Sequence, residues 1–492
     1  ASKSWLKARL PGVTVGFDPN LPTRGGLKTL TDLVPSVVLT AVANNPVDAI
    51  WTARPVSPDG PVRAHPPALA GKTVAEKLDE VRGSINADAL LIAASDSVTW
   101  LFNWRGSDVS HTPLVLSRAF IPKTGKATVF VDAHKLPVEV AEAASEHAHI
   151  ANPEGFLPTL ARLSEGLTVE AERNLTSEAA LRAIEDAGTI APVTDPTVRQ
   201  KAIKNPAEIA GMRAAHQRDG IAMTRFLAWL DQNAIGLSEI DLVKRLEGFR
   251  REAGAIDVSF DTIAGSGPHG AIVHYRVDKS TNRTVGAGEA ILIDSGGQYP
   301  DGTTDITRTV FAGEASDEFR VAFTRVLKGH IAIARQAFPE GASGAELDTL
   351  ARAALWNAGR DYAHGTGHGV GAALAVHEGP AGISRRSRAL LAPGMILSNE
   401  PGDYPGAFGI RIENLVLVRP PRVPVGGRTP MLSFETISLA PVDTRLVIPA
   451  LLTAAEIAWL DCYHARVHGA LVADLPPEDR DFLEARCRPL VG

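Results

Sequence analysis

The chain has 492 residues, of which 45% are apolar, and its 50 Lys and Arg against 56 Asp and Glu give a net charge of -6. This length predicts two to four globular domains, and the acidic balance argues against nucleic acid as a partner. No apolar run approaches the roughly 18 residues of a membrane span and no signal-peptide pattern is seen, so no membrane partner is expected. The two cysteines, Cys462 and Cys487, are too few for a disulfide framework and suit a reducing cytoplasm.

Residues 1–41 and 42–195 are predicted to belong to different domains. The first segment has one helix-like stretch and a short apolar strand around residues 13–17, too little for an independent core. We expect it to be the end of a domain whose earlier sequence lies upstream of Ala1. In residues 42–195, apolar runs such as ALLIAA and TVFVD alternate with helical patterns such as VAEKLDEVRG. This alternation predicts a mixed α/β domain with helices flanking a sheet.

A domain boundary is predicted near residues 196–204, where a Pro-containing stretch precedes a strong helix start. Asn205 can cap that helix, Pro206 suits its first position and Glu208 completes a capping box. Apolar residues on one face predict a core helix without chemistry of its own; they are Met223, Phe226, Leu227 and Leu230.

The tail, residues 431–492, contains a second capping box, formed by Thr453 and Glu456. An amphipathic run through Leu460 and His464 follows it. We expect a helix that packs on the preceding domain or contacts a second subunit.

The segment EAILIDSGGQYPDGTTDITRTVFAG predicts two apolar strands joined by a Gly- and Pro-rich connection, with Asp294 and Asp305 at the strand ends. Folding back would bring these two carboxylates together. An aspartate in an apolar strand is costly to bury unless it is paired or binds a cation. Turn or capping roles are the alternative for either motif alone, and Asp301, in an Asp-Gly dipeptide, needs no other explanation.

The segment DYAHGTGHGVGAALAVHEGP places His364, His368 and His377 in a run too rich in glycine for a stable helix. Each histidine alone could be a satisfied core residue. Three within fourteen residues favour a functional cluster, and the glycines indicate close approach of the backbone to a ligand.

The segment LAPGMILSNEPGDYPGAFGIRIENLVLV carries Glu400 before a Pro-Gly turn and Glu413 in an apolar strand. Strand alternation sends Arg411 and Glu413 to the same face, so an ion pair between them is the alternative to a ligand role.

Asp294, Asp305, His368, Glu400 and Glu413 together are four carboxylates and one imidazole, the ligand set expected for two hard or borderline divalent cations. Two such ions about 3.5 to 4 Å apart can share a hydroxide that attacks a carbonyl while they polarise it. This chemistry is that of peptide or amide hydrolysis.

The motifs IDSG, DGTTDITRT, HGTGHGVG, VHEGP, NEPG and RIEN, in this order, resemble those of the pita-bread metallopeptidases. Within that superfamily the chain is similar to Xaa-Pro aminopeptidase (aminopeptidase P), in the long type of the eukaryotic cytosol. The segments GPHGAIVHYR, TNRT, AFGIRIEN and WLFNWRGSDVSHTP carry this likeness, which covers nearly the whole chain.

The resemblance implies an α/β and α+β multidomain protein. A remnant of an N-terminal creatinase-like domain would cover residues 1–41, and a creatinase-like α/β domain residues 42–195. A pita-bread catalytic domain would cover residues 196–430, with residues 431–492 as its C-terminal extension.

The resemblance also implies roles for site residues. Asp294 would bind one metal and His368 the other, with Asp305, Glu400 and Glu413 completing or bridging the pair. Glu400 would also shuttle protons. His274, His364, His377 and Arg411 would contact the substrate: His274 stabilises it during attack, His364 and His377 line the proline side, and Arg411 lies near that wall.

The activity implied is dinuclear hydrolysis of the bond between an N-terminal residue and a penultimate proline. The metals would be Mn²⁺, with Zn²⁺ or Co²⁺ as alternatives, and the protein a cytoplasmic homodimer. Prolidase, which takes only dipeptides, is the main alternative. Methionine aminopeptidase, creatinase and a non-catalytic peptide- or protein-binding module are further alternatives; the preceding domain argues against the first, and the five intact ligands against creatinase.

Overall fold

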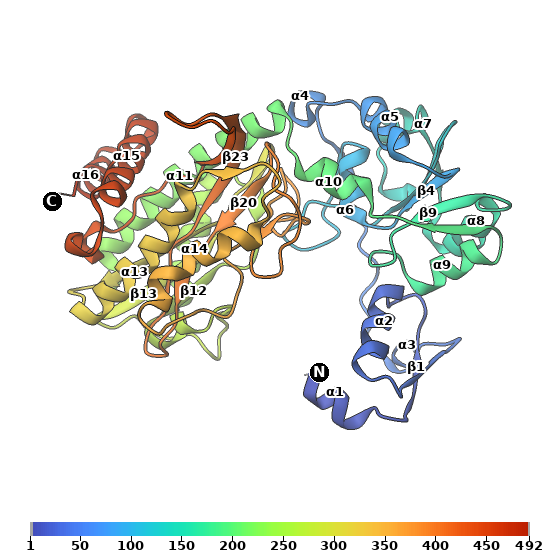
Figure 1. The fold of residues 1–492 in the computed structure, drawn as a ribbon, viewed down its shortest axis with the longest axis horizontal. Helices are drawn as coiled ribbons and strands as arrows, with labels where there is room; N and C mark the ends of the chain where they lie inside the picture. Colours follow the sequence, from blue (N-terminus) through green and yellow to red (C-terminus); the bar gives the residue numbers. More distant parts are fainter. Residues whose placement is uncertain (1–2, 491–492) are drawn as a thin grey trace. The chain divides into compact units, whose positions relative to one another are not determined.

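The structure is a computed structural model that describes residues 3–490 (Figure 1). The chain divides into two compact units. The first comprises Ala1–Val109 and Leu114–Val198, and the second comprises Ser110–Pro113 and Arg199–Gly492. The finer division into four parts stays a prediction.

The first unit begins with a small α/β element. Strands β1 (Thr14–Phe17) and β2 (Val38–Ala41) pair in parallel, and α2 (Arg24–Leu33) connects them. The strand predicted around residues 13–17 is therefore confirmed. Arg24 ties this element to the rest of the unit, since its Nε donates to Glu178 Oε2 at 2.8 Å.

A mixed six-stranded sheet forms the centre of the first unit, in the order β10-β9-β4-β6-β7-β8. All four residues of β4 are buried, as expected for a central strand covered on both faces. The strands are β4 (Ala89–Ile92), β6 (Arg118–Pro122), β7 (Ala127–Phe130), β8 (Ala148–Ala151), β9 (Thr168–Ala171) and β10 (Thr189–Pro192). The helices around them are α5 (Val74–Ser84), α6 (Ser95–Leu101), α7 (Val138–Ser145), α8 (Phe156–Leu163) and α9 (Glu178–Glu185). The predicted α/β architecture is confirmed.

Helix α11 (Pro206–Asn233) follows α10 (Pro196–Ala202) and begins as predicted. The Asn205 side chain accepts from the backbone of Ala207 and Glu208, and the Glu208 side chain completes the capping box. The four predicted apolar residues of this helix are buried. Helix α12 (Glu239–Glu252) packs beside it.

Two antiparallel sheets position the chemistry of the second unit. In one, β13 (Glu289–Ser295) lies between β12 (Ile263–Ser266) and β16 (Ile306–Ala312). The other has the order β17-β24-β23-β20, with β17 (Phe338–Pro339), β20 (Ile396–Asn399), β23 (Asn414–Arg422) and β24 (Met431–Thr436). Shorter strands are β14 (Gly297–Tyr299), β15 (Gly302–Thr303), β18 (Gly367–His368), β19 (Gly382–Ile383), β21 (Gly402–Asp403) and β22 (Ile410–Arg411). Helices α13 (Asp317–Ala334) and α14 (Gly344–Trp356) pack against each other, and side chains of α13 share a buried apolar cluster with Ile410 and Ile412.

One predicted strand is wrong in detail. The apolar run around Glu413 is not continuous, because β22 ends at Arg411 and β23 begins at Asn414. The Glu413 backbone N–H instead donates to the Thr307 carbonyl oxygen at 3.1 Å, which holds this break against β16.

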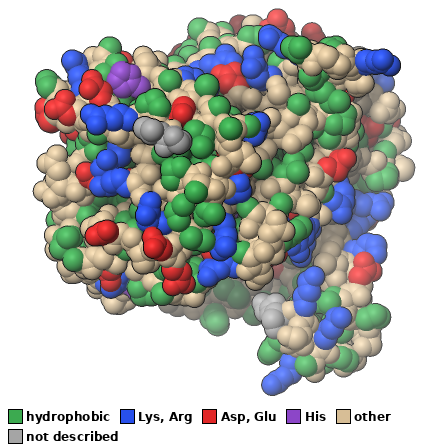
Figure 2. All heavy atoms as spheres, turned by 60° about the vertical axis from the view of Figure 1, so that its left-hand side comes forward, with side chains coloured by type: hydrophobic (Ala, Val, Ile, Leu, Met, Phe, Trp, Pro, Cys, Tyr) green, Lys and Arg blue, Asp and Glu red, His purple; other side chains and the backbone are tan. Residues whose placement is uncertain are grey.

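Helix α15 (Ala454–Leu471) starts at the predicted Thr453–Glu456 capping box and buries Leu460 and His464. Helix α16 (Pro477–Arg486) follows it. Among residues 3–490, no helix combines the length and apolar character needed to cross a membrane. On the face drawn in Figure 2, Lys and Arg side chains are interspersed with Asp and Glu.

Candidate active site

A single cavity of about 240 Å³ in the second unit brings the predicted site residues together. Its lining includes all nine of them: His274, Asp294, Asp305, His364, His368, His377, Glu400, Arg411 and Glu413. Phe260, Ile263 and Val273 add an apolar part to the wall. Such a mixture, apolar walls with convergent titratable groups, is typical of an active site.

Strands β13 and β16 supply the two aspartates. Asp294 lies on β13 opposite Thr307 of β16, and Asp305 directly precedes β16. The predicted fold-back of the two strands is thus confirmed. Both carboxylates are largely buried, and the charge of Asp294 is among the causes that raise the pKa of Asp305.

His368 on β18 presents its Nε2 to the carboxylates. This atom lies 3.4 Å from Asp305 Oδ2 and 3.7 Å from Glu400 Oε1. The other ring nitrogen, Nδ1, lies 3.0 Å from the Gly369 carbonyl oxygen, which can only accept. Nδ1 therefore carries the proton, and Nε2 is left free to bind a cation.

Burial and mutual repulsion act on the carboxylates of this cavity. Burial, together with Asp294 and Glu400, raises the pKa of Asp305 well above its usual range. Burial, together with Asp305 and Asp294, does the same to the pKa of Glu413. Burial also raises the pKa of Glu400, against the opposing charges of His368 and Arg411. Several buried carboxyl groups thus lie close together with too few positive charges to balance them.

These residues fit a pair of divalent cations. Asp305, His368 and Glu413 each offer one ligand atom within 4.8 Å of the other two. Asp294 and Glu400 line the same cavity without belonging to this tightest group. Among the described residues, Asp294 Oδ1 and Asp305 Oδ1 are buried without a hydrogen-bond partner. Buried oxygens left unsatisfied in this way need a cation or a proton.

A chain of polar contacts connects Asp294 to His364. The Arg411 guanidinium pairs with Asp294, and its Nη1 donates to the Tyr404 hydroxyl at 2.7 Å. That hydroxyl lies 2.9 Å from His364 Nε2. The predicted alternative, an ion pair between Arg411 and Glu413, is therefore wrong, because the guanidinium faces Asp294. Tyr404 was not predicted; nothing in its Gly- and Pro-rich loop distinguishes it from a turn residue.

Two histidines of the cavity, His364 and His377, are held neutral. Burial and the nearby Arg411 lower the pKa of His364 to about 4, and burial and His368 lower that of His377 to about 4. The rings of His368 and His377 lie 4.2 Å apart between centroids. Next to His377, the buried Glu378 carboxylate accepts from Lys204 Nζ at 2.6 Å, a contact that sequence reasoning missed.

A larger cavity, about 410 Å³, lies at the end of α11. Its acids and bases satisfy one another, because Arg445 pairs with both Asp231 and Asp443. The smaller cavity is therefore the site at which a cation is needed.

Four carboxylates and an imidazole around one cavity define a metallohydrolase centre. Comparison of the sequence with known protein families agrees with this class. Residues 210–420 match the metallopeptidase family M24, residues 53–208 match the creatinase/prolidase N-terminal domain, and residues 430–490 match the C-terminal region of peptidase M24. The chain belongs to the Xaa-Pro aminopeptidases of the metallopeptidase family M24.

The similar proteins support this placement. A probable Xaa-Pro aminopeptidase P from Aspergillus flavus is 38% identical over 480 residues, which cover 93% of this chain and 73% of that protein. The crystal structure of X-prolyl aminopeptidase from Caenorhabditis elegans, described as a cytosolic enzyme with a di-nuclear active site, matches with a TM-score of 0.94. It is 34% identical, with 100% of this chain and 83% of that chain covered. An Xaa-Pro dipeptidase from Bacillus anthracis is 26% identical, with a TM-score of 0.61 and coverage of 75% and 99%. The predicted creatinase-like and pita-bread fold is confirmed.

Proposed function

We propose that the chain is a metal-dependent Xaa-Pro aminopeptidase that hydrolyses the bond between an N-terminal residue and a penultimate proline. The observation that carries this is the cavity with four carboxylates, His368 and three further histidines. Membership in the family supports it, and so does the di-nuclear site named for the Caenorhabditis elegans relative.

The metal ions would be held by residues that line the cavity: Asp294, Asp305, His368, Glu400 and Glu413. Two divalent ions bound there would polarise the scissile carbonyl and activate the attacking water. Asp294 Oδ1 and Asp305 Oδ1 are buried without hydrogen-bond partners, and bound cations would offset the cost of burying them.

Recognition of proline must come from side chains. An Xaa-Pro bond is a tertiary amide without the N–H that peptidases usually hold, and its ring fixes φ near about -65°. The neutral rings of His364 and His377 can contact the proline ring and the scissile region, and His274 lines the same cavity. Arg411 keeps the His364 side of the wall in place through Tyr404.

Glu400 is proposed to move the proton. Its Oε2 lies 3.9 Å from His364 Nδ1, and Oε1 lies 3.7 Å from His368 Nε2. From this position the carboxyl can take a proton from the attacking water and deliver it to the proline nitrogen. A Glu400→Gln variant that keeps full turnover would overturn this role.

The first test is hydrolysis of Arg-Pro-Pro and Arg-Pro by metal-stripped protein, with and without added Mn²⁺. Metal-dependent release of the first residue from the tripeptide, with little cleavage of the dipeptide, is expected. Cleavage of the dipeptide alone would indicate a prolidase. No cleavage of either by protein that has bound two ions would contradict the proposal.

Three finer features belong to the same proposal. Mn²⁺ is proposed as the physiological metal, with Zn²⁺ and Co²⁺ as alternatives, since all suit this ligand set. A cytoplasmic location is supported by the cytosolic relative. A homodimer is proposed on the family resemblance, and sedimentation of a strict monomer at micromolar concentration would overturn it.

A further inference from the structure

The substrate histidine His274 lies on a loop with almost no core of its own. From Ala271 to Thr284, Tyr275 is the one buried side chain, at 5% exposure, and the rest are exposed or half-buried. The Tyr275 backbone N–H donates to the Ile272 carbonyl oxygen at 3.0 Å. This bond closes a turn with His274 as its third residue, so the position of Tyr275 fixes the direction of His274.

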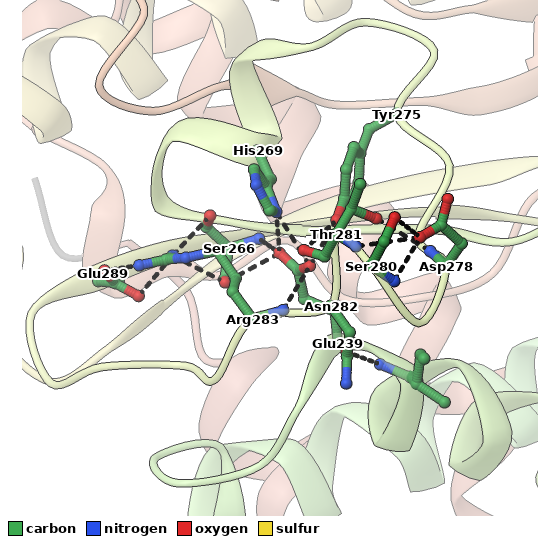
Figure 3. A network of polar contacts seen from close by, with 11 residues as sticks. Glu239, Ser266, His269, Tyr275, Asp278, Ser280, Thr281, Asn282, Arg283 and Glu289 are labelled. Atoms are coloured by element: carbon green, nitrogen blue, oxygen red, sulfur yellow. Dashed lines mark hydrogen bonds and ion pairs between the residues drawn. The ribbon is translucent and has the colours of Figure 1, made fainter.

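Beneath this turn, the Tyr275 hydroxyl meets a buried carboxylate. It donates to Glu239 Oε2 at 2.7 Å, and the ring packs at 4.4 Å between centroids on the His269 ring (Figure 3). Burial raises the pKa of Tyr275 to about 12, so the hydroxyl keeps its proton at neutral pH and can only be the donor to this carboxylate.

Glu239 collects donors from both ends of the loop. At the first end, Ser266 donates its backbone N–H at 2.8 Å and its hydroxyl at 3.0 Å, and His269 Nδ1 lies 3.0 Å from the carboxylate. At the second end, the Arg283 backbone N–H lies 3.4 Å from Glu239 Oε2. The side chain is fully buried at the first turn of α12, where the helix dipole favours a negative charge.

The start of α12 also holds the second end of the loop through its backbone. The Glu239 N–H donates to the Arg283 carbonyl oxygen at 3.0 Å, and the Ile240 N–H donates to Asn282 Oδ1 at 3.0 Å. The Arg283 guanidinium bonds Ser266 and Glu289, which ties the two ends of the loop together (Figure 3). Between these ends, the Tyr275 hydroxyl is the link from the middle of the loop to Glu239.

We propose that Glu239 and Tyr275 are positioning residues that hold the His274 turn at the mouth of the active-site cavity. The proposal rests on the proposed function of His274. Glu239 acts at the base of the loop and Tyr275 transmits its position to the next residue. Without this link, His274 would sample orientations away from the substrate, and the enzyme would lose alignment and keep its metals.

The test is a double-mutant cycle on the Mn²⁺-loaded enzyme, with kcat/KM for Arg-Pro-Pro as the readout. Tyr275→Phe removes the hydroxyl and keeps the ring, and it should lower kcat/KM about tenfold. In a His274→Ala background the same change should cost less than about twofold, because the residue that Tyr275 positions is already absent. Equal losses in both backgrounds would overturn the proposal.

Lys279→Ala is the matched control, since it alters an exposed side chain of the same loop without touching the anchor. It should leave kcat/KM within about twofold. Metal content should stay at two ions per chain in every variant; loss of metal from Tyr275→Phe would contradict a positioning role and indicate wider damage.

A readout without turnover separates this proposal from the proposed activity. Trypsin can cut after the exposed Arg276 and Lys279, and a loosened loop should be cut roughly fivefold faster in Tyr275→Phe and in Glu239→Gln than in wild type. If wild type fails to cleave Arg-Pro-Pro, the proposed activity falls while this readout still reports on the anchor. Unchanged proteolysis in both variants would overturn the anchor.

Discussion

Glu413 and Glu239 are both buried glutamates of the second unit, but their surroundings differ. Glu239 receives a backbone N–H and hydroxyl from Ser266, the Tyr275 hydroxyl and a helix N-terminus. Glu413 receives the Thr307 hydroxyl at 2.8 Å, and burial, together with the neighbouring acids, raises its pKa well above the usual range against the opposing effect of His368. The protein itself supplies the donors that Glu239 needs, whereas the surroundings of Glu413 fit its proposed role as a metal ligand. A buried acid is therefore assigned a role by its partners, and burial alone does not distinguish an anchor from a metal ligand.

The sharpest test of this difference is removal of one acid from the acidic cavity. Asp305→Asn should lower kcat/KM for Arg-Pro-Pro by more than ~10³-fold, because it removes a ligand with an unsatisfied buried oxygen. Asp301→Asn is the control from the same connection between the strands: Asp301 pairs with Arg218 near the surface, and activity should stay within about twofold. Full activity in Asp305→Asn would remove Asp305 from the site.

The same substitution should have opposite effects on the two glutamates in metal-free protein. Glu239→Gln leaves donors facing an amide and should destabilise by about 2–3 kcal/mol. Glu413→Gln relieves repulsion, and its carbonyl oxygen can still accept from Thr307, so it should stabilise by about 1–2 kcal/mol. Thermal unfolding in EDTA measures both changes in stability. Destabilisation by both variants would erase the distinction between the two glutamates.

The advantage of Glu413→Gln should depend on pH. A carboxyl whose folded pKa lies above its unfolded value binds more protons when folded, so its contribution to stability is lost as pH rises through the folded pKa. In metal-free wild type this applies to Asp305, Glu400 and Glu413. The difference in unfolding free energy between Glu413→Gln and wild type should therefore shrink by about 1 kcal/mol as pH falls from about 8 to about 5. Scans with saturating Mn²⁺ are the control; a gap in EDTA that is constant with pH would contradict repulsion as its cause.

Sequence reasoning succeeded where chemistry and order along the chain were sufficient. Asp294 stands in an apolar strand and Asp305 directly precedes the next one, and the three histidines stand among glycines, so the residue pattern pointed to both clusters. Helix α11 was predicted from its capping box because the cap is local. Pairings between distant segments were not predictable in this way. The break at Glu413 depends on β16, and the contact of Arg411 with Asp294 depends on β13; both strands lie more than 100 residues away in the sequence.

Glu239 was missed for a similar reason. An acid in the first turn after the Ser238 cap is what any exposed helix start would show. Its full burial comes from the loop that folds over it, and Tyr275 looks in the sequence like one more loop residue. Loops that carry site residues need an anchor in the rigid part of the fold. A search for the anchor of the His274 loop would have found Glu239 and Tyr275.

The smallest expected effect concerns His464, a buried base outside both carboxylate sites. Its titration adds to the pH dependence of stability in every variant compared above. His464 on α15 accepts from the Val442 N–H at 3.1 Å, and burial and Arg308 lower its pKa to about 4. In the unfolded state this imidazole has a pKa of about 6.5 and binds a proton that it does not bind in the folded state. Stability therefore falls as pH drops below that value. The resulting loss of unfolding free energy is about 0.7 kcal/mol between pH 7 and pH 6. His464→Gln keeps an acceptor and should remove that share from the urea-unfolding free energy; an unchanged pH slope would mean that the imidazole is charged in the folded protein.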